Sequence, residues 1–170
     1  MAIVVYDIPP IPPDPEYTRY LDAGVLRLGL EYRTLDDAEL DRAYADDAKS
    51  KAAIDAAKPA EVDDRGVSIH VLGAEDGHEY LRFDVFEKGP HYHYIHSGRV
   101  ENKIVDFDTV AMGDMLPWAL EQIRSNLPVM LAHAGGGELG EQVDPGLLAS
   151  RTRELEELAR EARRAQGVTD

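Results

Sequence analysis

The stretch of sequence that decides the fold runs from Val67 to Asp108 and reads VSIHVLGAEDGHEYLRFDVFEKGPHYHYIHSGRVENKIVDFD. Short runs in it alternate apolar and polar residues, and glycine-containing turn sequences separate them. Alternation with a period of two is typical of strands that bury one face, so the stretch predicts an antiparallel meander of about three to four strands. Five of the chain's six histidines lie within it.

The two central strands of this meander share a polar face. In the first of them, apolar residues alternate with Arg82 and Asp84. A two-residue turn at 88–89, where hairpins favour glycine, would place Asp84 opposite His93 and bring His91 onto the same face. The opposite face would then carry the apolar residues and the tyrosines, and would meet the core.

The neighbouring strands add two candidates to the polar face. In the preceding strand, valine and isoleucine take the apolar face, so His70 joins the charged set. In the following strand the same logic turns Asp106 towards the histidines, beside His93. These registers predict a row of Asp84, His93 and Asp106 across three strands, with His91 one step away. A slip of one residue would reverse the faces.

Two imidazoles and a neighbouring carboxylate are the donor set of a metal site. Histidines two apart on a strand lie about 6–7 Å apart at the backbone, which lets both rings converge on one ion. Either Asp84 or Asp106 would be the third ligand, with His70 in reserve. Such a set leaves positions open for water, oxygen or substrate, as in non-haem iron(II) and catalytic zinc sites.

The sequence therefore predicts a small metal-dependent enzyme that acts on a small molecule. The expected cofactor is a divalent metal ion: iron, zinc, manganese or nickel. Oxygenase, lyase and hydrolase chemistry all fit this donor set. The candidate catalytic residues are His91, His93, Asp84 and Arg82.

The histidine pair resembles the first ligand pair of cupins, which is also His-x-His on a strand. The resemblance covers His91 and His93 only. In cupins a glutamate and then a glycine follow, with a distant third histidine. Here Gly98 precedes Glu101, and the remaining downstream histidine, His133, lies in a predicted helix.

Two other functions fit the same residues. One face of an antiparallel sheet is often solvated, and the histidines would then be surface groups of a non-enzymatic acidic protein that binds a basic partner. Alternatively, a pocket between Tyr92, Tyr94, Phe83 and the helix that contains Trp118 would make the chain a carrier of a small ligand.

Charge and composition limit the partners. A net charge of −15 repels phosphate, which argues against nucleic acid and anionic membranes. The absence of cysteine excludes disulfides and thiolate metal sites. The N-terminus lacks the features of a signal peptide, and no apolar run approaches the roughly 20 residues of a membrane span, so we expect a cytoplasmic protein.

The remaining segments predict one α+β domain over residues 1–170. Residues 1–16 form a proline-rich arm that begins with a short edge strand; a proline-rich docking ligand is the alternative. A half-buried strand follows at 25–32. A capping box at Thr34 predicts a helix that ends at Lys58.

The C-terminal third predicts helices packed on one face of the sheet. Asp114 would cap a helix that Pro128 kinks or divides. The glycines from 135 to 140 spell GxGxxG, but they follow a helix, which favours a helix stop over a dinucleotide site. A last helix in the segment 147–170 would pack on the domain or form a homo-oligomer.

Overall fold

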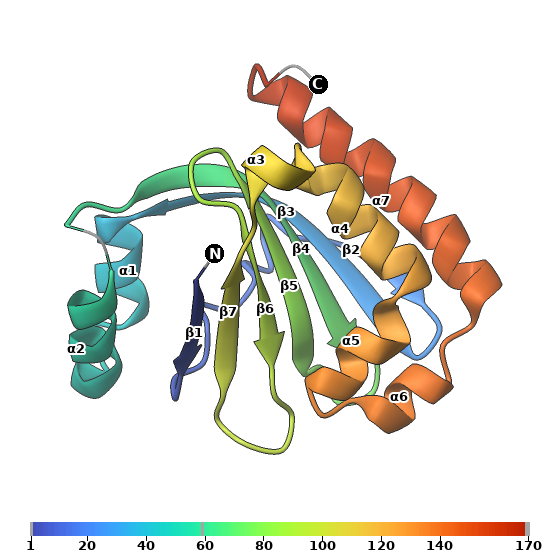
Figure 1. Cartoon of the computed structure of the whole chain (residues 1–170), viewed down its shortest axis with the longest axis horizontal. Coiled ribbons are helices and arrows are strands. Elements are labelled where there is room, and N and C mark those ends of the chain that lie inside the picture. The colour runs from blue at the N-terminus through green and yellow to red at the C-terminus, as the bar shows by residue number, and fades with distance from the viewer. Residues whose placement is uncertain (1, 59, 169–170) are drawn as a thin grey trace.

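In the computed structural model, which describes residues 2–58 and 60–168, seven strands form one antiparallel sheet (Figure 1). The spatial order is β1-β7-β6-β5-β4-β3-β2, so the strands from β2 to β7 form a continuous meander and β1 returns to pair with β7. The sheet curls into a half-barrel. The strands are β1 (Ile3–Tyr6), β2 (Arg19–Ala23), β3 (Leu26–Asp36), β4 (Asp63–Gly73), β5 (Glu79–Phe86), β6 (His91–Ile95) and β7 (Asn102–Asp106).

Helices lie on both sides of this curled sheet (Figure 1). The C-terminal helices pack on its apolar face, while the two N-terminal helices lie beyond its polar face, near β1. The helices are α1 (Asp37–Ala43), α2 (Ala48–Ala57), α3 (Thr109–Met112), α4 (Met115–Ser125), α5 (Leu127–His133), α6 (Gly137–Glu141) and α7 (Pro145–Ala165). The predicted α+β class, with an antiparallel meander and the C-terminal helices packed on one face, is confirmed. None of the helices described is both long and apolar enough to cross a membrane.

The hydrophobic core fills the space between the apolar face and the C-terminal helices. Strand residues such as Phe83 and Ile69 are fully buried against helix residues such as Leu116 and Ile123. The aromatic side chains of the predicted carrier pocket belong to this core. The ring centroid of Trp118 lies 5.0 Å from that of Tyr92 and 6.1 Å from that of Phe83. These rings fill the space where the carrier hypothesis placed a ligand.

The predicted helix from Thr34 to Lys58 is wrong at its start and in its continuity. Residues 34–36 instead extend β3, because they pair with residues 63–65 of β4. Asp36 is the N-cap of α1, with its side chain accepting from the backbone N–H of Glu39. A second cap at Asp47 then opens α2. Asp36 and Thr34 are both suitable N-cap residues. The helix begins after Asp36 because residues 34–36 pair with β4.

The predicted cap and the predicted break in the helical segment after Gly113 are confirmed. Asp114 caps α4, and the helical segment divides into α4 and α5 just before Pro128. Gly135 lies just after the C-terminus of α5 and has a φ of 81°, a backbone conformation that favours glycine. The apolar stripe of α7 packs within the domain, with Leu148 and Leu155 buried. Strand β2 and helices α3 and α6 were not predicted, and α6 begins within the glycine stretch that was predicted only to end a helix.

A candidate metal site on the polar face of the sheet

Strands β5 and β6 bring Asp84 and the two histidines together, in a register two residues away from the predicted one. Asp84 lies opposite His91, and Arg82 lies opposite His93. A shift of two residues preserves the face of every side chain, so the predicted polar face is correct although its pairs are not.

The connection between β5 and β6 causes this shift. It spans residues 87–90 rather than two residues. The carboxylate of Asp64 accepts the backbone N–H groups of Lys88 (3.0 Å) and Gly89 (2.7 Å), which holds the loop open. Pro90 has no backbone N–H and so cannot donate a hydrogen bond to the neighbouring strand at this position. Because Asp64 is distant in sequence, the hairpin alone did not reveal the wider loop.

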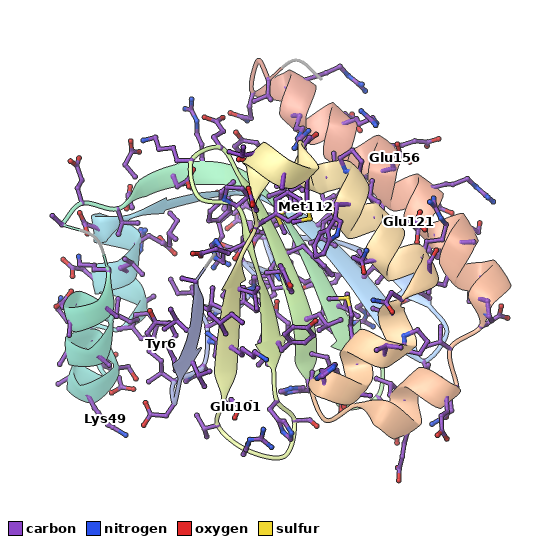
Figure 2. The ribbon with its side chains drawn as sticks, viewed as in Figure 1. Tyr6, Lys49, Glu101, Met112, Glu121 and Glu156 are labelled. Carbon is purple, nitrogen blue, oxygen red and sulfur yellow. The ribbon has the colours of Figure 1, made fainter. Side chains whose placement is uncertain are left out.

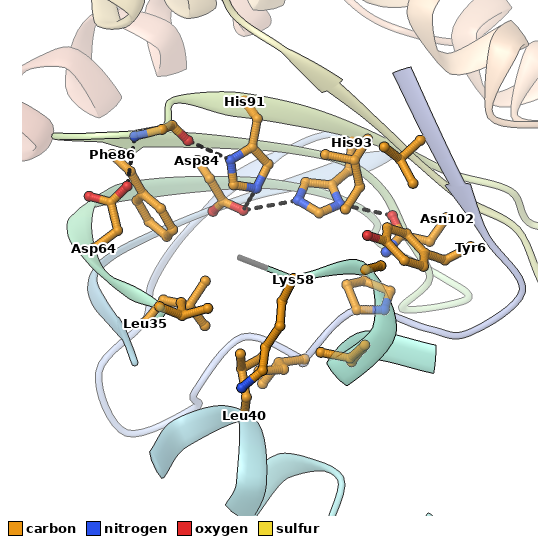
Figure 3. Close-up of a pocket in the computed structure, with 18 of the residues that line it drawn as sticks. Tyr6, Leu35, Leu40, Lys58, Asp64, Asp84, Phe86, His91, His93 and Asn102 are labelled. Atoms are coloured by element: carbon orange, nitrogen blue, oxygen red, sulfur yellow. Dashed lines mark hydrogen bonds and ion pairs between the residues drawn. The ribbon is translucent and has the colours of Figure 1, made fainter. Parts of the chain in front are cut away.

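Three side chains converge on one point of the polar face (Figure 3). Nε2 of His93 lies 3.0 Å from Oδ2 of Asp84, and Nε2 of His91 lies 3.3 Å from the same oxygen. One ligand atom from each of the three lies within 4.8 Å of the others. Donors that share an ion at about 2.1 Å are about 3.0–3.4 Å apart in octahedral or tetrahedral geometry. The two nitrogen–oxygen separations therefore fit a common ion.

Nδ1 of each imidazole, the ring nitrogen that does not face Asp84, forms a hydrogen bond with an oxygen. Nδ1 of His91 donates to the carbonyl of Gly89 (2.8 Å), and Nδ1 of His93 donates to Oδ1 of Asn102 (2.8 Å). Metal-bound histidines in proteins are commonly oriented by this kind of outer hydrogen bond. With the proton on Nδ1, the lone pair of each neutral ring lies on Nε2 and points at the carboxylate.

The surroundings keep two of the three side chains in the forms that bind metals. Burial alone would raise the pKa of Asp84, but its contacts with His91 and His93 outweigh this and hold its pKa well below the usual range. Burial lowers the pKa of His93 below its ordinary value, so this ring stays neutral. The pKa of His91 is raised, because the nearby Asp84 outweighs the effect of burial. An ionised carboxylate and a neutral imidazole are ligand forms.

The hydroxyl of Ser68 on β4 completes the surroundings of Asp84. It donates to Oδ1, the carboxylate oxygen that does not face the histidines. Asp84 and His93 are 3% and 4% exposed. Such burial differs from the solvated sheet face on which the surface-group alternative depends.

His70 lies on the same face but does not join the three. Its Nδ1 is 2.6 Å from Glu79 and its Nε2 is 3.1 Å from Glu31, so both nitrogens face carboxylates. A ring that donates to two carboxylates is an imidazolium. These contacts raise the pKa of His70 against the opposing effect of burial. A protonated ring has no lone pair for a metal.

Asp106 and Arg82 are also placed apart from the three. Asp106 pairs with His91 rather than His93, is exposed, and accepts the backbone N–H of Ala2 at 3.2 Å. Arg82 is buried and forms a bidentate pair with Glu79, at 2.8 and 2.7 Å. Arg82 also donates to the carbonyl of Ile11 in the N-terminal arm, at 2.6 Å.

A cavity of about 630 Å³ opens over the three converging side chains. This volume falls within the range of small-molecule sites, about 300–1,000 Å³. Asp84, His91 and His93 lie on one side, and Leu35, Leu40 and Lys58 lie across from them (Figure 3). The N-terminal arm and β1 supply another wall.

The sequence prediction missed Asn102, Glu31 and Glu79. Asn102 has the same parity on β7 as Asp106, so alternation could have placed it on the polar face. Glu31 likewise alternates with the leucines of β3. Glu79 is the first residue of β5 and lies before the regular apolar–polar alternation begins, so alternation did not place it on the polar face.

The model of a family described as "Domain of unknown function (DUF7700)" matches residues 20–161. The chain belongs to this family. The matched DUF7700 region contains Asp84, His91 and His93, whereas β1 and the arm residues that line the cavity precede it. Searches of curated proteins and of solved structures found no match.

Proposed function

We propose that the chain is a small metal-dependent enzyme whose divalent metal is held by Asp84, His91 and His93. The observation that carries the proposal is the direction of the two imidazoles. Both turn Nε2 towards one carboxylate oxygen while Nδ1 donates to an oxygen of its own.

A cation explains this direction better than hydrogen bonding among the three side chains. With Nδ1 protonated, a neutral imidazole presents a lone pair to a carboxylate lone pair, and these repel unless a positive charge lies between them. A second proton would supply that charge at His91, whose pKa is raised, but burial lowers the pKa of His93 and opposes a second proton there. One divalent ion satisfies both rings and the carboxylate together.

Three protein ligands leave coordination positions for a substrate. A metal bound here would act as a Lewis acid or activate a bound water at these positions. The cavity lies on the same side, so a small molecule in it would reach them. Asp84 would remain ionised, while Gly89 and Asn102 would hold the imidazole rings in place.

Metal content of the untagged protein tests the proposal. After reconstitution with iron, zinc, manganese and nickel in turn, we expect close to one equivalent of at least one metal per chain. His91→Ala and His93→Ala should each lose most of it. His133→Ala is the matched control, because His133 is exposed at the end of α5. Wild-type protein that retains none of the four metals, or equal loss in all three variants, would contradict the proposal.

A further inference from the structure

The cavity over the candidate metal site has mostly apolar walls. The arm contributes Ile8 and Ile11, and α1 and α2 contribute Leu40 and Ile54 across from the histidines. Further apolar side chains come from β1, β3, β5 and β7: Val4, Tyr6, Leu35, Phe86 and Ile104. A ligand that fills this space must therefore bury an apolar body.

The cationic side chains that line the described cavity are already paired. Arg82 binds Glu79 at 2.7 Å, and Arg33 lies 3.5 Å from Glu31. Lys58 and Lys88 are paired with aspartates, Asp37 and Asp63 respectively. None of these four provides an unpaired positive charge for an anionic ligand. The metal would be the remaining positive centre.

Charge at the metal then selects the headgroup of the ligand. A divalent ion with two neutral imidazoles and the Asp84 carboxylate has a net charge of +1. A singly charged oxygen donor would neutralise it, which favours binding in a partly buried site because uncompensated charge there is costly. A dianionic head would leave a negative charge among the carboxylates at the rim.

From these walls and charges we propose that the site binds an amphipathic monoanion, an apolar molecule with one carboxylate-like headgroup on the metal. The inference rests on the proposed metal function and adds the ligand class. The headgroup coordinates the ion beside Asp84, and the apolar body extends towards Leu40 and Ile54. Medium-chain carboxylic acids represent the class.

Octanoate and acetate test it with protein loaded with cobalt(II), whose visible spectrum responds to a new ligand. Each fully buried methylene tightens binding about fourfold, so burial of half of octanoate's six extra methylenes predicts about 60-fold tighter binding than acetate. Octan-1-ol and octylammonium carry the same tail with the wrong head. They should produce no comparable spectral change.

A variant in the wall separates the tail from the metal. Leu40→Asn should weaken octanoate binding about tenfold or more while leaving acetate binding and metal content unchanged. Helix α1 has no fully buried residue, so the substitution is compatible with the fold. Val129→Asn is the control, because Val129 is 58% exposed on α5, outside the cavity lining.

The outcomes distinguish the two proposals. If cobalt binds stoichiometrically but octanoate binds no more tightly than acetate, the ligand inference is overturned and the metal function stands. If octanoate binds equally well to metal-free protein by calorimetry, the headgroup contact with the metal is overturned. If neither cobalt nor any of iron, zinc, manganese and nickel binds, the metal function itself fails.

Discussion

His91 and Asp84 lie directly opposite each other on neighbouring strands, with Nε2 of the histidine 3.3 Å from Oδ2 of the aspartate. A cross-strand pair of this kind is common on a polar sheet face. This one differs because the imidazole's other nitrogen donates to a backbone carbonyl, which leaves Nε2 as the lone-pair nitrogen in the neutral ring.

The outer contact of His93 should control metal affinity. Asn102→Leu removes the acceptor of Nδ1 and should weaken metal binding about 10–100-fold. Asn102→Asp keeps an acceptor and should retain affinity close to that of the wild type. Competition against a chromophoric chelator measures both variants. Equal affinity of the leucine variant and the wild type would refute the role assigned to Asn102.

Glu79 should be important for stability, because it pairs with both Arg82 and His70 in a buried network. Glu79→Gln breaks two ion pairs, which leaves Arg82 without its paired carboxylate and His70 with Glu31 alone. We expect a loss of about 3–5 kcal/mol in the free energy of unfolding. Urea denaturation measures it.

The matched control for that experiment is Glu87→Gln. Glu87 pairs with Arg65 at 3.2 Å in a solvent-exposed position. Exposed pairs contribute about 1 kcal/mol or less, so this variant should unfold near the wild-type midpoint. Similar losses in the two variants would show that the buried network has no special role.

The same network predicts how stability depends on pH. The pKa of His70 is raised above 6.5, so its contribution is complete below that pH and is lost as the pH rises through the folded-state pKa. The pKa of Glu79 is lowered from 4.5 to about 2, because the nearby Arg82 and His70 outweigh the opposing effect of burial. Its contribution is present above 4.5 and is lost as the pH falls towards 2.

Urea denaturation between pH 4 and pH 9 tests this dependence. The free energy of unfolding contributed by the network should be largest between pH 4.5 and pH 6.5 and should fall as the pH rises through the raised pKa of His70. His70→Gln should lack the alkaline loss, because glutamine does not titrate. An unchanged alkaline slope in this variant would assign the loss to another group.

Gly66 should tolerate no side chain. It lies in β4 opposite Phe86, and a Cβ there would collide with the backbone carbonyl of Val85. Since backbone must move, Gly66→Ala should cost about 1–3 kcal/mol in the free energy of unfolding. Gly89→Ala is the comparison, because its Cβ would lie in ordinary contact, 3.5 Å from Asp64. Its urea midpoint should stay close to the wild-type value.

Alternation in the sequence was sufficient to identify the polar face. His70, Arg82, Asp84, His91, His93 and Asp106 all have the parity that the pattern predicts. Parity survives a register shift of two residues, whereas the identity of each cross-strand neighbour does not. The predicted row of Asp84, His93 and Asp106 is therefore replaced by Asp84 opposite His91, with Asp106 on the far side of His91.

The sequence by itself determined the fold class, the buried face of each central strand and the breaks in the C-terminal helices. These depend on periodicity, caps and prolines, which act over a few residues. Only the tertiary structure decided which side chains meet. Asp64 sets the width of a loop more than twenty residues away, and Asn102 orients His93 from the next strand. Such contacts depend on how distant segments pack, because a local pattern carries no information about them.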